Sequence, residues 1–546
     1  MKKNTFIQGA VIATVAIVIT KIIGILYVIP FYPLIGEQGG ALYGYAYSIY
    51  NMFLNISIGG IPFAISKITS EYYSLGKYYL KEKAYKVGKY FIIILGLISF
   101  VLLFFFSDQI AYLFIRNIEG GNTIQDVSYV IKMVSFALLV VPALSVSRGY
   151  LQGHKFISPS SNSQVIEQVI RVVFLLSGSY LALKVLNLSL RSAVGISVFA
   201  ATIGALSAYL YIISKIFKNK DKLNKDYEES KEDKKVSSKD ILKKIIVIAI
   251  PFILIDAIRS IYGFIDLLTI NKTMVSLGYS IVESEAVIGT LSTWGMKLNS
   301  ILYAISTGLI ISLIPNITSS NALKDNEDVK NKTNKALQSL IFVILPATVG
   351  LSFLSTPVWN IFFGSDSIVG PLVFSYSIFT AFIVCINNVT SSVLHSLSYS
   401  KKVIFSILIG VICKVALTIP LMYLADIIGL HASYGITTST IIGFSVCILF
   451  NLHYIKKYTN ISYKDTFNRF IKTLINVIVM LLCLILLSKL IPINNLSRVG
   501  YLIITFIYAI VGAVIYLFIS TKTKLIYDIF GNNIYKRILH KIKIKK

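Results

Sequence analysis

Charged residues are scarce in this sequence. Asp, Glu, Lys and Arg together make up 14% of the 546 residues, whereas soluble proteins carry about a quarter. Cysteine is also rare, with four residues that lie one per apolar segment and show no CxxC spacing: Cys385, Cys413, Cys447 and Cys483. These two shortages exclude a soluble enzyme of this length and a disulfide-rich secreted scaffold. The hydrophobic share of 55% excludes a disordered chain and favours a polytopic membrane protein.

Motifs for catalysis are absent as well. The sequence contains no Walker loop, no HExxH and no GxSxG, and its five histidines are scattered without metal-ligand spacing. We therefore expect no enzyme activity, no bound metal and no cofactor. A transporter of this kind would draw on the membrane potential, on a gradient of Na⁺ or H⁺, or on substrate supply, and the sequence leaves these alternatives open.

Long apolar segments recur along the chain. At about 20 residues per span, fourteen of them are long enough to cross a bilayer. Their approximate limits are 6–30, 41–66, 88–114, 127–151, 159–183, 188–214, 245–270, 286–318, 336–363, 371–399, 403–425, 430–455, 470–491 and 498–520. The first segment follows Lys2 and Lys3 and has no small-residue cleavage site, so we interpret it as a retained helix rather than a signal peptide.

The positive charges predict the orientation. With the N-terminus inside, most of the 52 Lys and Arg residues lie in cytoplasmic stretches, including the segment 215–244 and the tail 536–546. The outer loops hold only Arg116, Lys184, Arg191, Lys272, Lys489 and Arg498. This asymmetry follows the positive-inside rule and places both termini in the cytoplasm. The net charge of +27 is then a basic face beside anionic lipid, and no nucleic-acid partner is expected.

An internal repeat is visible around a charged linker. Ile61-Pro62 ends the second span and Ile314-Pro315 ends the eighth, and Leu151-Gln152-Gly153 matches Leu394-His395-Ser396 at the offset that carries Arg171 onto Lys414. The sequence therefore predicts an all-α polytopic protein with about 14 transmembrane helices, built as two six-helix lobes in parallel pseudo-repeat plus two C-terminal helices. The predicted boundaries are 1–217 for the N-lobe, 218–240 for the cytoplasmic linker, 241–457 for the C-lobe and 458–546 for the last two helices with their basic tail.

Ionisable residues occur inside the predicted spans, where each costs roughly 2.5–3.5 kcal/mol on insertion. The basic set near mid-depth is Lys21, Arg171, Arg259, Lys297 and Lys414, and the acidic set is Glu167, Asp256 and Asp266. Helical spacing places Arg259 about 60° and Asp266 about 80° from Asp256, so the three share one helix face. Glu167 and Arg171 stand four residues apart, which suits an ion pair.

Two interpretations of these charges remain open. In the first, Glu167–Arg171 and Asp256–Arg259 are ion pairs that tie helices together. In the second, the excess of cations lines a water-filled cavity for an anionic substrate, with the three acids serving in ion pairing or ion coupling. Lys21, Lys297 and Lys414 have no acid within a helical turn of sequence, so they favour the cavity.

Three stretches of the chain resemble the MurJ/SpoVB branch of the multidrug/oligosaccharidyl-lipid/polysaccharide (MOP) exporter superfamily. They are Thr20-Lys21-Ile22-Ile23-Gly24 leading to Pro30, Gly59-Gly60-Ile61-Pro62 with Ser66-Lys67 and Glu71, and Arg148-Gly149-Tyr150-Leu151-Gln152-Gly153 continuing through Gln164, Glu167, Gln168 and Arg171. The resemblance covers essentially the whole chain. It implies a MATE-like fold, a groove for a lipid tail on the last two helices, and a monomer.

The resemblance also implies a function. It implies that the chain flips an undecaprenyl-pyrophosphate-linked sugar, with lipid II as the expected one, across the bacterial plasma membrane for cell-wall or spore-cortex synthesis, alongside wall-synthesis enzymes. Lys21 and Lys297 match basic positions that would contact the pyrophosphate. Two positions depart from the family pattern: Tyr27-Val28-Ile29 replaces a basic residue before Pro30, and His395-Ser396 replaces the second Gln-Gly pair.

The alternatives are a flippase for another polysaccharide or teichoic-acid precursor, a MATE-type drug/cation antiporter, and a non-transporting scaffold of wall synthesis. For Arg148, Gln152 and Gly153 an ordinary helix end and an inner gate are both open interpretations.

Overall fold

The computed structural model describes residues 6–116, 120–220, 223, 236–493 and 496–531, and every regular element in these ranges is a helix. The core of the predicted linker and the basic tail 536–546 lie outside the described residues. The chain forms two compact units, Met1–Trp294 and Gly295–Lys546. The two units are defined by packing contacts within the structure. The six-plus-six repeat is a statement about sequence similarity, and it stays a prediction.

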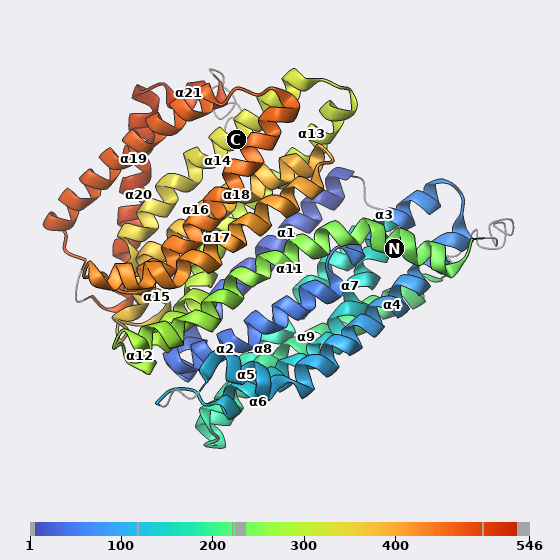
Figure 1. Cartoon of the computed structure of the whole chain (residues 1–546), viewed down its shortest axis with the longest axis horizontal. Coiled ribbons are helices and arrows are strands. Elements are labelled where there is room, and N and C mark those ends of the chain that lie inside the picture. Colours follow the sequence, from blue (N-terminus) through green and yellow to red (C-terminus); the bar gives the residue numbers. More distant parts are fainter. Residues whose placement is uncertain (1–5, 117–119, 221–222, 224–235, 494–495, 532–546) are drawn as a thin grey trace, which may run out of the picture. The chain divides into compact units, whose positions relative to one another are not determined.

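The first unit contains the elements up to Trp294 (Figure 1). In chain order these are α1 (Phe6–Leu26), α2 (Val28–Ile58), α3 (Ile61–Ser74), α4 (Tyr78–Phe105), α5 (Ser107–Ile115), α6 (Ile124–Ser135), α7 (Ala137–Gly153), α8 (Ile157–Tyr180) with a π-helical turn η1 (Leu181–Val185), α9 (Leu190–Lys218), α11 (Ser238–Ser276), α12 (Ile281–Gly289) and a second π-helical turn η3 (Thr290–Trp294). One buried cluster of this unit joins Ile65 of α3, Ala84 of α4, Tyr150 of α7, Ala208 of α9 and Ile245 of α11.

The break between α2 and α3 shows how the sequence directs this packing. Gly60 adopts φ +69°, a left-handed conformation that favours glycine, and Pro62 stands in the first turn of α3. A Cβ on Gly60 would lie 2.7 Å from Cβ of Phe252 and 2.9 Å from the carbonyl oxygen of Ala249. The Gly-Gly-Ile-Pro stretch therefore turns the chain and lets α11 approach its backbone.

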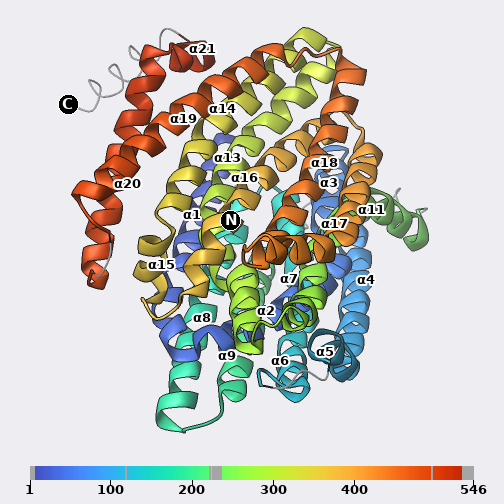
Figure 2. The same cartoon turned by 60° about the vertical axis from the view of Figure 1, so that its left-hand side comes forward.

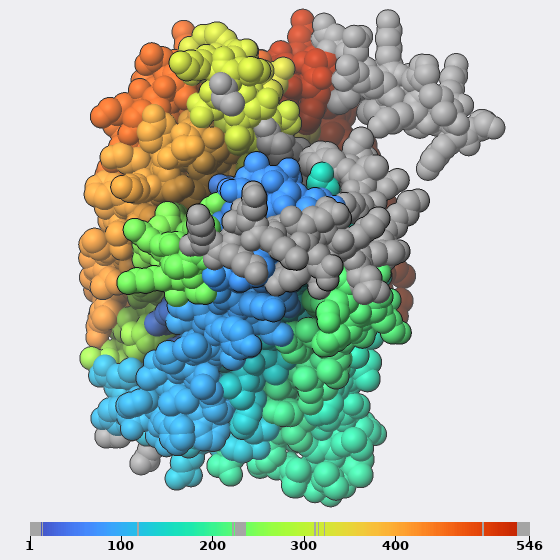
Figure 3. All heavy atoms as spheres, turned by 90° about the vertical axis from the view of Figure 1, so that its right-hand side faces the viewer, coloured from blue at the N-terminus to red at the C-terminus, as the bar shows by residue number. Residues whose placement is uncertain are grey.

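Helix α4 has an apolar surface suited to lipid. Seven of its large apolar side chains are exposed, and Figure 3 shows α4 (blue) forming a broad face of the first unit. They are Ile93, Ile94, Leu97, Ile98, Val101, Leu102 and Phe105. Such a continuous apolar surface favours burial in a bilayer.

The N-terminal end of α4 is polar, and it contacts described residues of the predicted linker. The Lys81 ammonium is fully buried and donates to the carbonyl oxygen of Leu223 at 2.6 Å. Lys83 donates to the carbonyl oxygen of Val236 at 2.7 Å. Two lysines of one helix thus bind the backbone at Leu223 and at Val236, two described positions of the predicted linker.

The second unit consists of α13 (Gly295–Ala322), α14 (Asn326–Phe353), α15 (Ser355–Phe363), α16 (Val369–Ser396), α17 (Ser400–Ile427), α18 (Ser433–Thr459), α19 (Lys464–Leu490), α20 (Arg498–Lys522) and α21 (Leu525–Phe530). Helices α17 and α18 pack closely, as do α13, α14 and α16. Helices α19 and α20 lie side by side, and α19 packs on α14 (Figure 2).

Eleven helical segments of the described chain are long and apolar enough to cross a membrane. Each of them overlaps one of eleven among the fourteen predicted spans. The other three, 6–30, 245–270 and 286–318, are covered by α1, by α11, and by α12 to α13. The chain is an all-helical, multi-pass membrane protein, as the composition predicts.

Candidate functional site

The candidate residues fall in both units. In the first unit Lys21 lies on α1, Arg148, Gln152 and Gly153 on α7, Glu167 and Arg171 on α8, and Asp256, Arg259 and Asp266 on α11. In the second unit Lys297 lies on α13 and Lys414 on α17. Lys21 is exposed on the surface of its unit, and Lys414 is fully buried.

Arg171 is surrounded by tyrosine hydroxyls rather than by a carboxylate. Its Nη2 donates to the hydroxyl oxygen of Tyr47 at 2.6 Å and to that of Tyr43 at 3.4 Å, and its guanidinium carbon lies 5.0 Å from the Tyr47 ring centre. The Tyr43 and Tyr47 rings stack with centroids 4.4 Å apart. Sequence reasoning missed these partners, although four tyrosines within residues 43–50 were a visible signal.

Glu167 pairs with another residue than the one expected. Its Oε2 lies 2.8 Å from Nη2 of Arg148 on α7, and none of the ion pairs in the described ranges joins it to Arg171. Glu167 therefore has Arg148 as its ion-pair partner in these ranges, and not Arg171 as in the first of the two interpretations of the sequence. Helix α8 turns Glu167 toward α7 and Arg171 toward α2, so two residues one turn apart serve different contacts.

The other residues of the Arg-Gly-x-x-Gln-Gly motif also make packing contacts within the first unit. Gln152 donates from Nε2 to Oγ of Ser160 at 2.9 Å. A Cβ on Gly149 would lie 2.4 Å from the carbonyl oxygen of Pro62, and one on Gly153 would lie 2.7 Å from that of Ser66. The motif thus seats α7 directly on α3 and ties it to α8, which supplies a structural reason for each of its residues. Its role in an inner gate stays a prediction.

Helix α11 carries Asp256, Arg259 and Asp266, all partly buried. In the part of the chain that the structure describes, Asp256 and Arg259 make no direct ion pair, but their charges are close enough to interact. Nε of Arg259 is buried and has no hydrogen-bond partner among the described residues. A buried guanidinium N–H without an acceptor is costly, which makes this group a candidate for binding an anion.

Lys414 is a buried cation of the second unit. Its ammonium donates to Oγ1 of Thr440 on α18 at 2.7 Å, and the next turn contains a further hydrogen bond between Thr418 and Ser439 at 3.0 Å. Lys297 is partly buried on α13. The contacts of Lys414 join α17 to α18, the two helices that correspond to the predicted eleventh and twelfth spans.

An apolar groove lies on the second unit. It has a volume of about 430 Å³ and is formed by α14, α19 and α20. Its lining includes Pro346 and Gly350 of α14, Met480 of α19, and Tyr508 and Gly512 of α20. The family resemblance implies a groove on the last two helices, and the structure adds α14 as its third wall.

The chain matches the model of one protein family, described as polysaccharide biosynthesis protein, over residues 6–320. It is 31% identical to the lipid II flippase MurJ of Bacillus subtilis (strain 168), with 97% of this chain and 98% of the relative covered. It is also 22% identical to stage V sporulation protein B of the same organism, with 76% and 78% covered.

Solved structures share the fold. A lipid II flippase MurJ in an inward closed conformation superposes with a TM-score of 0.67 at 17% identity, covering 94% of this chain and 98% of that one. An inward-facing multidrug resistance MATE family transporter of the MOP superfamily gives 0.64 at 14% identity, covering 82% and 99%.

Proposed function

This chain belongs to the MurJ lipid II flippase family, within the polysaccharide biosynthesis proteins of the MOP superfamily, and from this membership we propose that it moves an undecaprenyl-pyrophosphate-linked glycan from the inner to the outer leaflet. Lipid II is the expected substrate, because the curated relative named for it matches over nearly the full length of both chains. The protein is a transporter rather than an enzyme.

The observation that carries the proposal concerns the hydrogen-bond partners of two arginines. Arg171 binds tyrosine hydroxyls, and Arg259 has a buried Nε without an acceptor. Neither forms a direct ion pair with a carboxylate in the described ranges, although the charges of Arg259 and Asp256 interact. We propose that both guanidinium groups contact the anionic part of the substrate. Arginine binds phosphate oxygens through two parallel N–H groups, which suits a pyrophosphate.

The remaining cations extend this assignment. We assign pyrophosphate contacts to Lys21, Lys297 and Lys414 as well, and ion pairing or ion coupling to Glu167, Asp256 and Asp266. The groove on α14, α19 and α20 would hold part of the polyprenyl tail, because its lining is almost entirely apolar. Transport would follow alternating access and draw on the membrane potential or an ion gradient.

The predicted topology belongs to the same proposal. Both termini lie in the cytoplasm, since the basic segments then face the inner leaflet. The functional unit is a monomer that works beside enzymes of wall synthesis.

The test is rescue of a bacterial strain depleted of its own lipid II flippase. Wild type, Lys21→Ala and the control Lys489→Ala, which changes an exposed residue at the end of α19, are compared at matched membrane levels. We expect growth with wild type and the control and loss of growth with Lys21→Ala.

Rescue by all three would contradict a role for Lys21 and favour the scaffold alternative. Failure of a well-expressed wild type would contradict lipid II as the substrate. Teichoic-acid and capsule precursors would be assayed next.

A further inference from the structure

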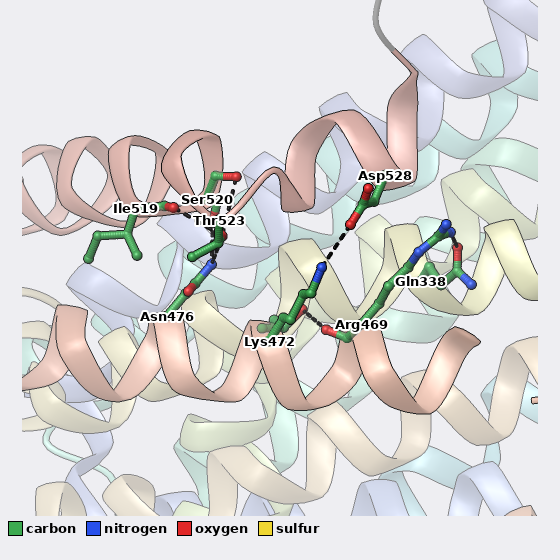
Figure 4. Close-up of polar contacts among 9 residues, drawn as sticks. Gln338, Arg469, Lys472, Asn476, Ile519, Ser520, Thr523 and Asp528 are labelled. Atoms are coloured by element: carbon green, nitrogen blue, oxygen red, sulfur yellow. Dashed lines mark hydrogen bonds and ion pairs between the residues drawn. The ribbon is translucent and has the colours of Figure 1, made fainter. Parts of the chain in front are cut away.

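The lining of the groove on the second unit changes from apolar to polar at one end. Three helices become polar within one turn of its apolar lining. On α14 Gln338 precedes Phe342, on α19 Asn476 precedes Met480, and on α20 Ser520 follows Tyr516. Asn476 donates to the hydroxyls of Ser520 and Thr523, both at 3.1 Å, which holds α19 against α20 at this point (Figure 4).

A polar pocket of about 480 Å³ lies beyond this end, between α19 and α21. It is lined by Asp465, Asn468, Arg469, Ile471, Lys472 and Asp528. Four of these residues, at positions 465, 468, 469 and 472, share one face of α19, because they are spaced three and four residues apart.

The pocket and the groove follow one another along α19. Lys472, Asn476, Met480 and Leu484 stand four residues apart, so they form one stripe of the helix. Lys472 in the pocket and Met480 in the groove are eight residues apart, which corresponds to about 12 Å along the axis. The pocket and the groove therefore lie at successive levels of one helix, at a spacing that suits the headgroup and the tail of a single lipid.

Arg469 and Lys472 provide the donors for an anionic group. The guanidinium of Arg469 donates from Nη1 to Oε1 of Gln338 (Figure 4). In the described ranges the guanidinium makes no other hydrogen bond. Four of the five N–H groups of an arginine remain for a ligand. Lys472 lies 3.0 Å from Asp528, but both side chains are at least a third exposed, and an exposed ion pair of this kind is readily exchanged for a phosphate.

The acids of the pocket limit the choice of ligand. Asp465, Asn468 and Asp528 present acceptors beside the two cations, so a bare phosphate would use only half of the lining. A headgroup with phosphate oxygens and several hydroxyl donors uses both halves. Sugar-linked diphosphates have this composition.

We propose that the pocket of Arg469, Lys472, Asp465, Asn468 and Asp528 binds the diphosphate and first sugar of a lipid-linked saccharide while its tail occupies the adjoining groove. This capture site rests on the proposed function and extends it, because it would hold the substrate at the membrane surface before transport. Its chemistry differs from that of the cations inside the spans, since here two acids and two bases line one pocket.

The test measures equilibrium binding to the purified full chain in nanodiscs by native mass spectrometry. The probes are lipid II, undecaprenyl diphosphate and phosphatidylglycerol. The double variant Arg469→Gln/Lys472→Gln is compared with wild type and with Lys489→Gln, an exposed change at the far end of α19. We expect lipid II to bind the double variant at least about tenfold more weakly, as for the loss of two charge-assisted contacts, and to bind Lys489→Gln as it binds wild type.

Gln338→Ala separates charge from structure, because it removes the bond between α14 and α19 and keeps both cations. We expect this variant to lose much less affinity than the double variant. Equal loss in both would overturn the proposal in favour of a packing role. A loss confined to phosphatidylglycerol would assign the pocket to bulk phospholipid and also overturn it.

Binding and transport can fail independently. A wild type that binds lipid II through this pocket but does not rescue a flippase-depleted strain would contradict the proposed function and leave the capture site in place. A wild type that rescues the strain and binds lipid II equally well after the double substitution would remove the capture site alone.

Discussion

Glu167 on α8 binds Arg148 on α7 with a separation of 2.8 Å between Oε2 and Nη2, although Arg171 stands one turn away on its own helix. The pair is mostly sheltered, with side-chain exposures of 25% and 15%. It connects the two halves of the motif that runs from Arg148 to Arg171. A contact between consecutive helices thus takes the place of a contact along one helix.

Exchanging the two residues of this pair should restore the stability that each single substitution removes. We expect Arg148→Glu and Glu167→Arg each to lower the free energy of unfolding by about 1–3 kcal/mol, because each leaves two like charges facing one another in a partly buried place. The combination of both should recover most of the loss. Thermal unfolding in detergent, followed by tryptophan fluorescence, measures the three variants. A double variant as unstable as the sum of the two would show that the ion pair is not what joins α7 to α8.

Gly149 should tolerate no side chain. A methyl group there would lie 2.4 Å from the carbonyl oxygen of Pro62, which belongs to the backbone of α3 and cannot rotate away. We expect Gly149→Ala to destabilise the protein by about 1–3 kcal/mol through overpacking. The matched control is Gly263→Ala on α11, where a Cβ meets nothing within 4 Å.

The control should be neutral or stabilise by roughly 0.5–1 kcal/mol, because alanine favours a helix interior more than glycine does. The two unfolding temperatures should therefore move in opposite directions or by clearly different amounts. Equal behaviour of the two variants would contradict the close approach of α7 to α3.

These examples show which features the sequence predicts well. Eleven of the fourteen predicted spans follow from hydropathy, because every backbone group in a bilayer must be satisfied within a helix and about 20 apolar residues are needed for each crossing. Side-chain partners do not follow in the same way. Helical spacing relates Glu167 to Arg171, but it carries no information about how far α8 is rotated relative to α7 and α2.

The pocket between α19 and α21 illustrates the same limit. Asp528 and Lys472 are 56 residues apart, and their contact depends on a turn after α20 where Lys524 adopts φ +59°. Gln338 and Arg469 are separated by 131 residues. Nothing in the local sequence of either partner indicates the other, whereas the family resemblance places a groove on the last two helices without naming the polar residues at its end.

Removing the Tyr47 hydroxyl, which accepts a hydrogen bond from Arg171, should destabilise the protein more than removing the neighbouring hydroxyl of Tyr50. Tyr47 accepts directly at 2.6 Å, whereas Tyr50 contacts the Tyr47 ring edge-on, with centroids 5.7 Å apart. We expect Tyr47→Phe to cost about 1.5–3 kcal/mol, the usual contribution of a hydrogen bond to a charged group, and Tyr50→Phe to cost clearly less. Unfolding temperatures and rescue of a flippase-depleted strain measure both variants. A larger effect of Tyr50→Phe would place the guanidinium elsewhere.

Glu285 should make the first unit sensitive to pH. This residue lies on α12 just before the predicted span 286–318, and it is 1% exposed. Oε1 accepts from the backbone N–H of Asn122 at 2.7 Å, while Oε2 is buried without a hydrogen-bond partner in the described ranges. Burial raises the pKa of Glu285 to about 7, above its ordinary value of 4.5, and the N–H of Asn122 only partly offsets this.

The sign of the effect follows from proton binding. Because the folded state holds the proton up to a higher pH than the unfolded state, the folded protein binds more protons between pH 4.5 and about 7. Stability should therefore fall as the pH rises through this window, by at most about 3 kcal/mol, and should stay level above it. Glu285→Gln keeps the acceptor for Asn122 and removes the titration, so its unfolding temperature should change less between pH 5 and pH 8 than that of wild type. Parallel pH profiles for the two proteins would show that Glu285 is ionised at low cost, and that the contact of α12 with the loop at Asn122 does not depend on its proton.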